Sequence, residues 1–147
     1  MTNKKLIIAG AVGAALCAAA AGGAAWAHHA FAAEFDGKAP VLLRGKVTRV
    51  EWINPHAWVH IKDGTTGQDW MVEGGTPNTL LRAGIDRNSL KPGTEIIVRG
   101  YQSKDKLCRP ACKANGRDVT FPDGKKLFMG SSGTGAPSDG SDPTERK

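Results

Sequence analysis

The alternation of apolar and polar residues predicts that this chain folds mainly into β-strands. The longest such segment covers residues 41–53. Its apolar positions share one parity up to Val47 and take the opposite parity from Val50 onward. A change of parity within a strand requires a bulge or a sharp bend, and Gly45 is a residue that tolerates one. We therefore predict a long first strand that is kinked past Gly45.

The next two segments predict a β-hairpin. Residues 56–62 alternate strictly between two faces. One face is apolar and carries Ala57, Val59 and Ile61. The other face is polar or aromatic and carries His56, Trp58, His60 and Lys62. Residues 63–67 (DGTTG) are typical of a turn, and residues 68–73 predict a third strand.

A short helix is expected after the third strand. Thr76 is a natural N-cap, Pro77 suits the first helical position and Gly84 suits the C-terminal end. Leu80 and Leu81 are expected to pack this helix onto the sheet.

The remaining pattern predicts more strands. Residues 94–101 form one strand, residues 102–116 a loop, and residues 118–129 a final hairpin. Three strands, one helix and then further strands form the element order of an OB-like β-barrel. The sequence therefore predicts a mostly β fold of this kind, with a β-sandwich as the alternative.

The N-terminal segment carries the features of a secretory signal. Lys4 and Lys5 precede an apolar stretch that ends in Ala25-Trp26-Ala27, a signal-peptidase site. We expect residues 1–27 to be removed, residues 28–129 to form one domain and residues 130–147, rich in Gly, Ser, Asp and Pro, to be a disordered tail. The signal predicts a periplasmic bacterial protein without a permanent membrane span.

The net charge and its distribution argue against a nucleic-acid-binding function. The 147-residue chain has a net charge of +6, which falls to +4 when Lys4 and Lys5 leave with the signal. These charges are scattered, whereas a nucleic-acid-binding protein concentrates them on one patch. We therefore expect no nucleic-acid partner. Four carboxylates without a visible partner are expected to be solvated: Glu34, Asp36, Glu51 and Glu73.

Two cysteines remain after signal removal, Cys108 and Cys112. In an oxidising compartment an even pair predicts a disulfide. The alternative is a pair of soft copper ligands in Cys-x3-Cys spacing. Cys17, within the signal, follows Leu16 rather than a small residue, so we do not expect a lipid anchor there.

The four histidines suggest a metal site. Cleavage after Ala27 makes His28 the new N-terminus, where its α-amine and imidazole can chelate one ion, and His29 follows it. The other two histidines, His56 and His60, lie close together in the second strand. The predicted ligands are His28 and His56, with His29 or His60 as a further one, and this set resembles a histidine brace. Nitrogen ligands of this kind favour Cu(II). In the alternative interpretation, the N-terminal pair is solvated and His56 hydrogen-bonds the backbone.

Aromatic residues offer a second candidate site. Trp52, Trp58 and Tyr101 could form a face that stacks on a flat ligand. Aromatic residues fill a core more often, but Trp58 shares its predicted face with both strand histidines.

Several sequence stretches are shared with a known family. The chain contains AHHAFAAEFD at 27–36, GKVT at 45–48 and EWINPHAW at 51–58, with TLLRAG, SLKPG and PDGKKLF further on. Together they resemble DUF6152, a family of small exported bacterial proteins of unknown function. The resemblance implies an exported protein with the family's fold, and it implies no reaction.

Three functions are compatible with these features. The leading hypothesis is a periplasmic copper-binding carrier or delivery factor, which implies a periplasmic copper-handling or redox partner. The second is a binding module that holds a small ligand or protein through its aromatic face. The third is a copper-dependent oxidoreductase. It is the enzymatic alternative, since the sequence shows no other catalytic constellation.

Overall fold

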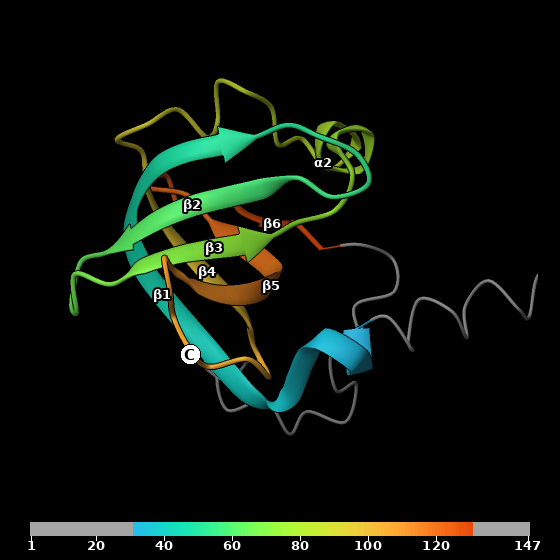
Figure 1. Ribbon diagram of the computed structural model, residues 1–147. Helices are drawn as coiled ribbons and strands as arrows, with labels where there is room; N and C mark the ends of the chain where they lie inside the picture. The colour runs from blue at the N-terminus through green and yellow to red at the C-terminus, as the bar shows by residue number, and fades with distance from the viewer. Residues whose placement is uncertain (1–30, 131–147) are drawn as a thin grey trace, which may run out of the picture.

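The computed structural model describes residues 31–130 (Figure 1). The predicted signal at residues 1–27, the two N-terminal histidines and the tail after residue 130 lie outside the described residues. Gly130, where the predicted tail begins, is buried and donates a backbone hydrogen bond to the carbonyl of Arg117 at 3.3 Å. Among the described residues, no helix is both long enough and apolar enough to cross a membrane.

Six strands and the short helix α2 follow a helical segment at residues 31–34. In chain order they are β1 (Phe35–Glu51), β2 (Trp58–Asp63), β3 (Asp69–Glu73), α2 (Pro77–Arg82), β4 (Glu95–Ser103), β5 (Cys112–Thr120) and β6 (Lys126–Phe128). The sheet order is β3-β2-β1-β4-β5-β6, and a parallel β3–β5 pairing closes five strands into a ring. The predicted mostly β, OB-like order with a helix between the third and fourth strands is confirmed. A single closed ring is not the two-layer arrangement of the β-sandwich alternative.

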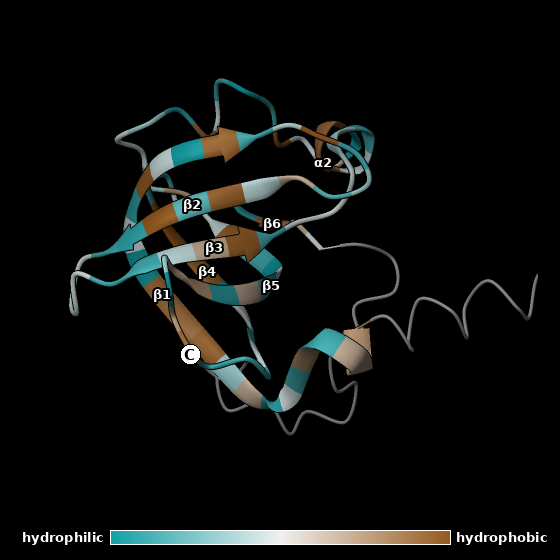
Figure 2. Cartoon of the chain, in the orientation of Figure 1, coloured by the Kyte–Doolittle hydropathy of each residue, from teal (hydrophilic) through white to brown (hydrophobic). Residues whose placement is uncertain are grey.

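The interior of the ring is filled by the inward-pointing apolar side chains of its strands. On β2 and just before it, Ala57, Val59 and Ile61 are at most 1% exposed, so the predicted inner face is confirmed. The outward residues of β2 are polar or aromatic, which gives the strand its alternating colours in Figure 2. β2 itself begins at Trp58 rather than at residue 56, after a cis Asn54–Pro55 bond.

The first strand is long and irregular, as the change of parity predicted. β1 runs from Phe35 to Glu51 and pairs antiparallel with both β2 and β4. Its register against β2 shifts between Val47 and Arg49, a short way past Gly45. At Gly45 the backbone lies so close to Lys62 that a Cβ would collide with the Lys62 carbonyl oxygen.

The capping signals of α2 are confirmed. The Thr76 hydroxyl accepts a hydrogen bond from the Thr79 amide at 3.1 Å, Pro77 starts the helix and Gly84 has a φ of 86°. Leu80 is fully buried. Leu81, which was also expected to pack on the sheet, is 53% exposed because the six-residue helix buries only one side.

The predicted loop at residues 102–116 is wrong at both ends, because β4 continues to Ser103 and the last five residues belong to a strand. β5 begins at Cys112 and pairs with β4 on one side and β3 on the other. Lys113, Asn115 and Gly116 give this segment little intrinsic strand preference, so its two neighbours decide its structure. Cys108 and Cys112 form the predicted disulfide. Their sulfur atoms are bonded to each other, which removes the alternative of a thiolate copper pair.

A second apolar cluster lies outside the ring. Phe31 and Phe35 pack against Tyr101, with ring centroids 5.8 Å apart for each contact of Phe31. Tyr101 points outward from β4, since its neighbours Gly100 and Val98 belong to the inner parity. The segment before β1 therefore covers part of the outer face of the sheet.

The close approach at Gly45 gives a test of the kinked first strand. We expect Gly45→Ala to lower the free energy of unfolding by about 1–3 kcal/mol, because an overpacked backbone contact must be relieved. Urea denaturation followed by circular dichroism measures this change. Thr48→Ala, at an exposed position of the same strand, is the control. Equal stability of the two variants would contradict the tight β1–β2 contact.

Candidate functional site

The candidate site lies on the outer face of the ring, along one row of cross-strand neighbours. Trp58 on β2 is paired with Glu51 on β1 and with Glu73 on β3. Glu73 is paired in turn with Asn115 on β5, and Asn115 with Tyr101 on β4. Because paired residues point to the same face, the row brings together side chains from five strands.

His56 stands beside this row and is held by Glu73. The His56 Nδ1 atom lies 3.0 Å from a carboxylate oxygen of Glu73 and 3.3 Å from the backbone carbonyl of Gly74. Both neighbours of Nδ1 are hydrogen-bond acceptors, so Nδ1 carries a proton and donates it. In the neutral ring the lone pair is then on Nε2. The His56 side chain is 36% exposed, which leaves it accessible from solvent.

Glu73 is buried, in contrast to the solvated charge that the sequence suggested. Its side chain is 10% exposed. Burial raises the pKa of the Glu73 carboxyl, and repulsion from Glu34 adds to this, whereas His56, an Asn115 hydrogen bond and Lys113 lower it. The sequence offered no signal for this pairing, because a single alternating strand does not show which residues lie opposite it.

Asn115 completes the polar cluster around Glu73. Its amide nitrogen donates to the Glu73 carboxylate at 3.3 Å, and the residue is 4% exposed. The Asn115 Oδ1 atom is buried and has no hydrogen-bond partner among residues 31–130. A buried acceptor without a partner is costly, so a donor or cation arriving here would be favoured.

His60 belongs to a different group of charges. Its Nε2 atom lies 2.8 Å from a Glu51 carboxylate oxygen and 3.1 Å from the Arg49 guanidinium. Arg49 also donates to the same Glu51 oxygen, at 2.6 Å. Glu51 is therefore paired rather than isolated. The guanidinium next to the imidazole repels cations, so His60 is a poorer position for a metal ion than His56.

Residues 31–34, the segment before β1, are anchored next to this site by hydrogen bonds and an aromatic contact. The backbone carbonyl of Glu34 accepts hydrogen bonds from the Lys104 amide at 2.9 Å and the Ser103 hydroxyl at 3.2 Å. Phe31 packs edge-on against Tyr101, which is paired with Asn115. Glu34, at the end of this segment, is one of the charges that raise the pKa of the Glu73 carboxyl.

The structure brings together only some of the predicted site residues. Within residues 31–130, no three or more His, Cys, Asp and Glu side chains form a group that could hold a metal ion. His28 and His29 lie outside the described residues. The site of the metal hypothesis is therefore one described histidine, His56, together with ligands that the N-terminal pair would supply.

The three residues of the predicted aromatic face do not form one common surface. Tyr101 is completely buried under Phe31, so its ring is not available for stacking on a ligand. Trp52 packs against the main core, with the Arg87 guanidinium 5.4 Å from its ring centre. Of the three aromatic residues, only Trp58 lies between Glu51 and Glu73, the carboxylates that contact His60 and His56.

Comparison with protein families identifies the chain. The model of DUF6152, a family of unknown function, matches residues 15–109. The protein belongs to this family. No curated protein and no solved structure matches it. The family match includes all four histidines and Glu73 and ends before β5, so Asn115 and the PDGKKLF stretch lie beyond it.

Burial of Glu73 gives a pH-dependent prediction for this DUF6152 protein. A carboxyl whose pKa is raised by folding destabilises the native state once the pH exceeds its ordinary value of about 4.3. We therefore expect Glu73→Gln to be more stable than the wild type at pH 7, with the difference shrinking to near zero below pH ~4. Thermal unfolding across this pH range measures the difference.

The exposed Glu95→Gln variant controls for the loss of one carboxylate as such. A Glu73→Gln variant that is less stable than the wild type at pH 7 would show that the bond to His56 outweighs the cost of burial.

Proposed function

We propose that this protein binds a metal ion, with copper preferred, and acts in the periplasm as a carrier or delivery factor. The ligands would be the α-amine and imidazole of His28 and the Nε2 atom of His56. His29 would be an optional further ligand. His60 becomes a control position, because Arg49 and Glu51 already contact its ring.

The observation that supports this proposal is the contact between His56 and Glu73. A carboxylate that receives the proton of one ring nitrogen fixes the ring and leaves the other nitrogen free to bind a metal. Nε2 of His56 makes no hydrogen bond to any residue between 31 and 130, and the ring is half-exposed. This is the arrangement that metal-binding histidines adopt with their supporting carboxylates.

The anchored segment before β1 would put the mature N-terminus within reach. Phe31 lies on Tyr101, and two strand spacings, roughly 10 Å, separate Tyr101 from Glu73 through Asn115. His28 precedes Phe31 by three residues, which span at most about 10 Å of extended chain. The reach of these three residues is comparable with that separation, which supports the proposal that His28 and His56 share one ion.

The charges around His56 favour a cation. The Glu73 carboxylate lies 3.0 Å from its Nδ1 atom, and a second carboxylate, Glu34, acts on Glu73, with Lys113 as the opposing charge. Imidazole and amine nitrogens suit Cu(II), which also heads the affinity order of divalent first-row ions. The α-amine has a pKa of about 8, so losing its proton to a metal costs little at neutral pH.

The proposed location agrees with the disulfide. Cys108 and Cys112 are bonded, as expected in an oxidising compartment. A carrier in that compartment implies a periplasmic copper-handling or redox protein as the partner that takes the ion.

The test is a Cu(II) titration of natively processed protein whose mass shows cleavage after Ala27. We expect one equivalent to bind with a nitrogen-rich electron paramagnetic resonance signal. One extra alanine before His28 should abolish that signal, because the chelating amine is displaced. His56→Ala should weaken binding by at least about tenfold, since it removes a ligand.

His60→Ala is the matched control and should bind copper like the wild type. Weak binding that is equal in the wild type, the extended protein and His56→Ala would overturn the proposal. Loss of binding in His60→Ala but not in His56→Ala would move the site to the Glu51 side of Trp58.

A further inference from the structure

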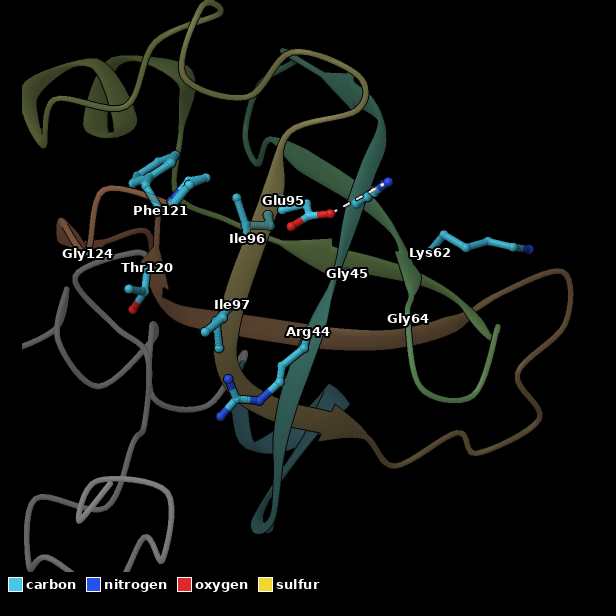
Figure 3. Close-up of a pocket in the computed structure, with 12 residues that line it drawn as sticks. Arg44, Gly45, Lys62, Gly64, Glu95, Ile96, Ile97, Thr120, Phe121 and Gly124 are labelled. Carbon is cyan, nitrogen blue, oxygen red and sulfur yellow. Dashed lines mark ion pairs between the residues drawn. The ribbon is translucent and has the colours of Figure 1, made fainter.

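A groove on the outside of the ring is lined by neither of the two described histidines, His56 and His60. It has a volume of about 620 Å³ and lies where β1, β4 and the end of β5 meet (Figure 3). Its volume falls within the range of roughly 300–1,000 Å³ typical of small-molecule sites. Gly45, Gly64 and Gly124 line part of it, and a Cβ at Gly124 would meet nothing within 4 Å.

The floor of this groove is apolar. Ile97 on β4 is the cross-strand neighbour of Thr120 on β5, and both side chains point outward into the groove. Phe121 and Pro122 continue the apolar surface beyond Thr120. Ile97 and Phe121 are partly exposed, so a bound molecule would remove apolar surface from water.

The rim of the groove carries an excess of positive charge. Lys46 is paired with Glu95, the only carboxylate among the lining residues, at 3.6 Å, and Lys62 is paired with Asp69 at 3.0 Å. Arg44 is the direct neighbour of Ile97 across β1 and β4, and Figure 3 shows its side chain reaching toward Ile97. The Arg44 guanidinium makes no ion pair or hydrogen bond with the part of the chain that the structure describes.

We propose that this groove binds a small amphiphilic anion, a single apolar chain or ring system that ends in one carboxylate. The apolar body would lie on Ile97 and Phe121, and the carboxylate would pair with Arg44, whose planar guanidinium matches a carboxylate with two parallel hydrogen bonds. The site takes a free molecule rather than a bilayer, because the apolar surface is hollowed and a membrane needs a protruding one. It is independent of the metal proposal, since it shares no residue with the candidate site around His56.

The experiment is a nuclear magnetic resonance titration of the full mature protein with sodium octanoate, octan-1-ol and octylammonium. We expect octanoate to shift the amide signals of Gly45, Ile97 and Gly124 and to bind most tightly of the three. The alcohol should bind more weakly and the ammonium weakest, because only the carboxylate can pair with Arg44.

Two variants of exposed arginines test whether Arg44 provides the positive charge that pairs with the carboxylate of the ligand. Arg44→Gln should weaken octanoate binding by about threefold to tenfold, as expected for a charge-assisted bond at a partly exposed site, and leave octan-1-ol unchanged. Arg82→Gln on α2 is the matched control and should leave all three titrations unchanged.

Equal affinity for the three probes, or shifts that avoid the groove, would overturn the proposal. So would co-sedimentation with anionic lipid vesicles in the absence of octanoate binding, because a membrane surface would then be the partner.

Discussion

The parallel pairing of β3 with β5 is the contact on which the rest of this structure depends. It joins β3, at one end of the sheet, to β5, the strand next to the other end, and Val72 and Ala114 at this pairing are completely buried. Closing the ring separates an apolar interior from an outer face and pairs the free edge of β3. The same pairing sets Asn115 next to Glu73, so the polar cluster outside the ring follows from the bond that closes it.

Much of the fold could be predicted because its signals are local. The strict alternation before and along β2 gave both of its faces, and Thr76, Pro77 and Gly84 gave the helix with its two ends. β5 could not be predicted in the same way. Its residues around Asn115 and Gly116 have little strand preference, and they form a strand because β3 and β4 lie on either side. A strand that forms because of contacts with distant segments carries no recognisable pattern in its own sequence.

The candidate site shows the same division. The face shared by Trp58 and His60 followed from the period of two, and the alternative of a backbone hydrogen bond for His56 is confirmed by its contact with the Gly74 carbonyl. The carboxylate partner of each histidine could not be predicted. His56 and Glu73 are 17 residues apart, and only the hairpin register brings them together. The burial of Tyr101 has a similar cause. Its outward position in β4 suggested exposure, and it is covered by Phe31, a residue 70 positions earlier in the chain.

The position of Glu73 is the strongest argument that the outer row has a function beyond holding the fold. A buried carboxylate is destabilising, and an apolar residue here would pack at lower cost. The neighbouring Asn115 adds a second unfavourable feature, a buried oxygen without a partner among the described residues. Natural proteins keep such features mainly at sites where the polar groups act on something. Here Glu73 holds the Nδ1 nitrogen of His56, as the proposed metal site requires. A fold that needed only stability would have no reason to keep this combination.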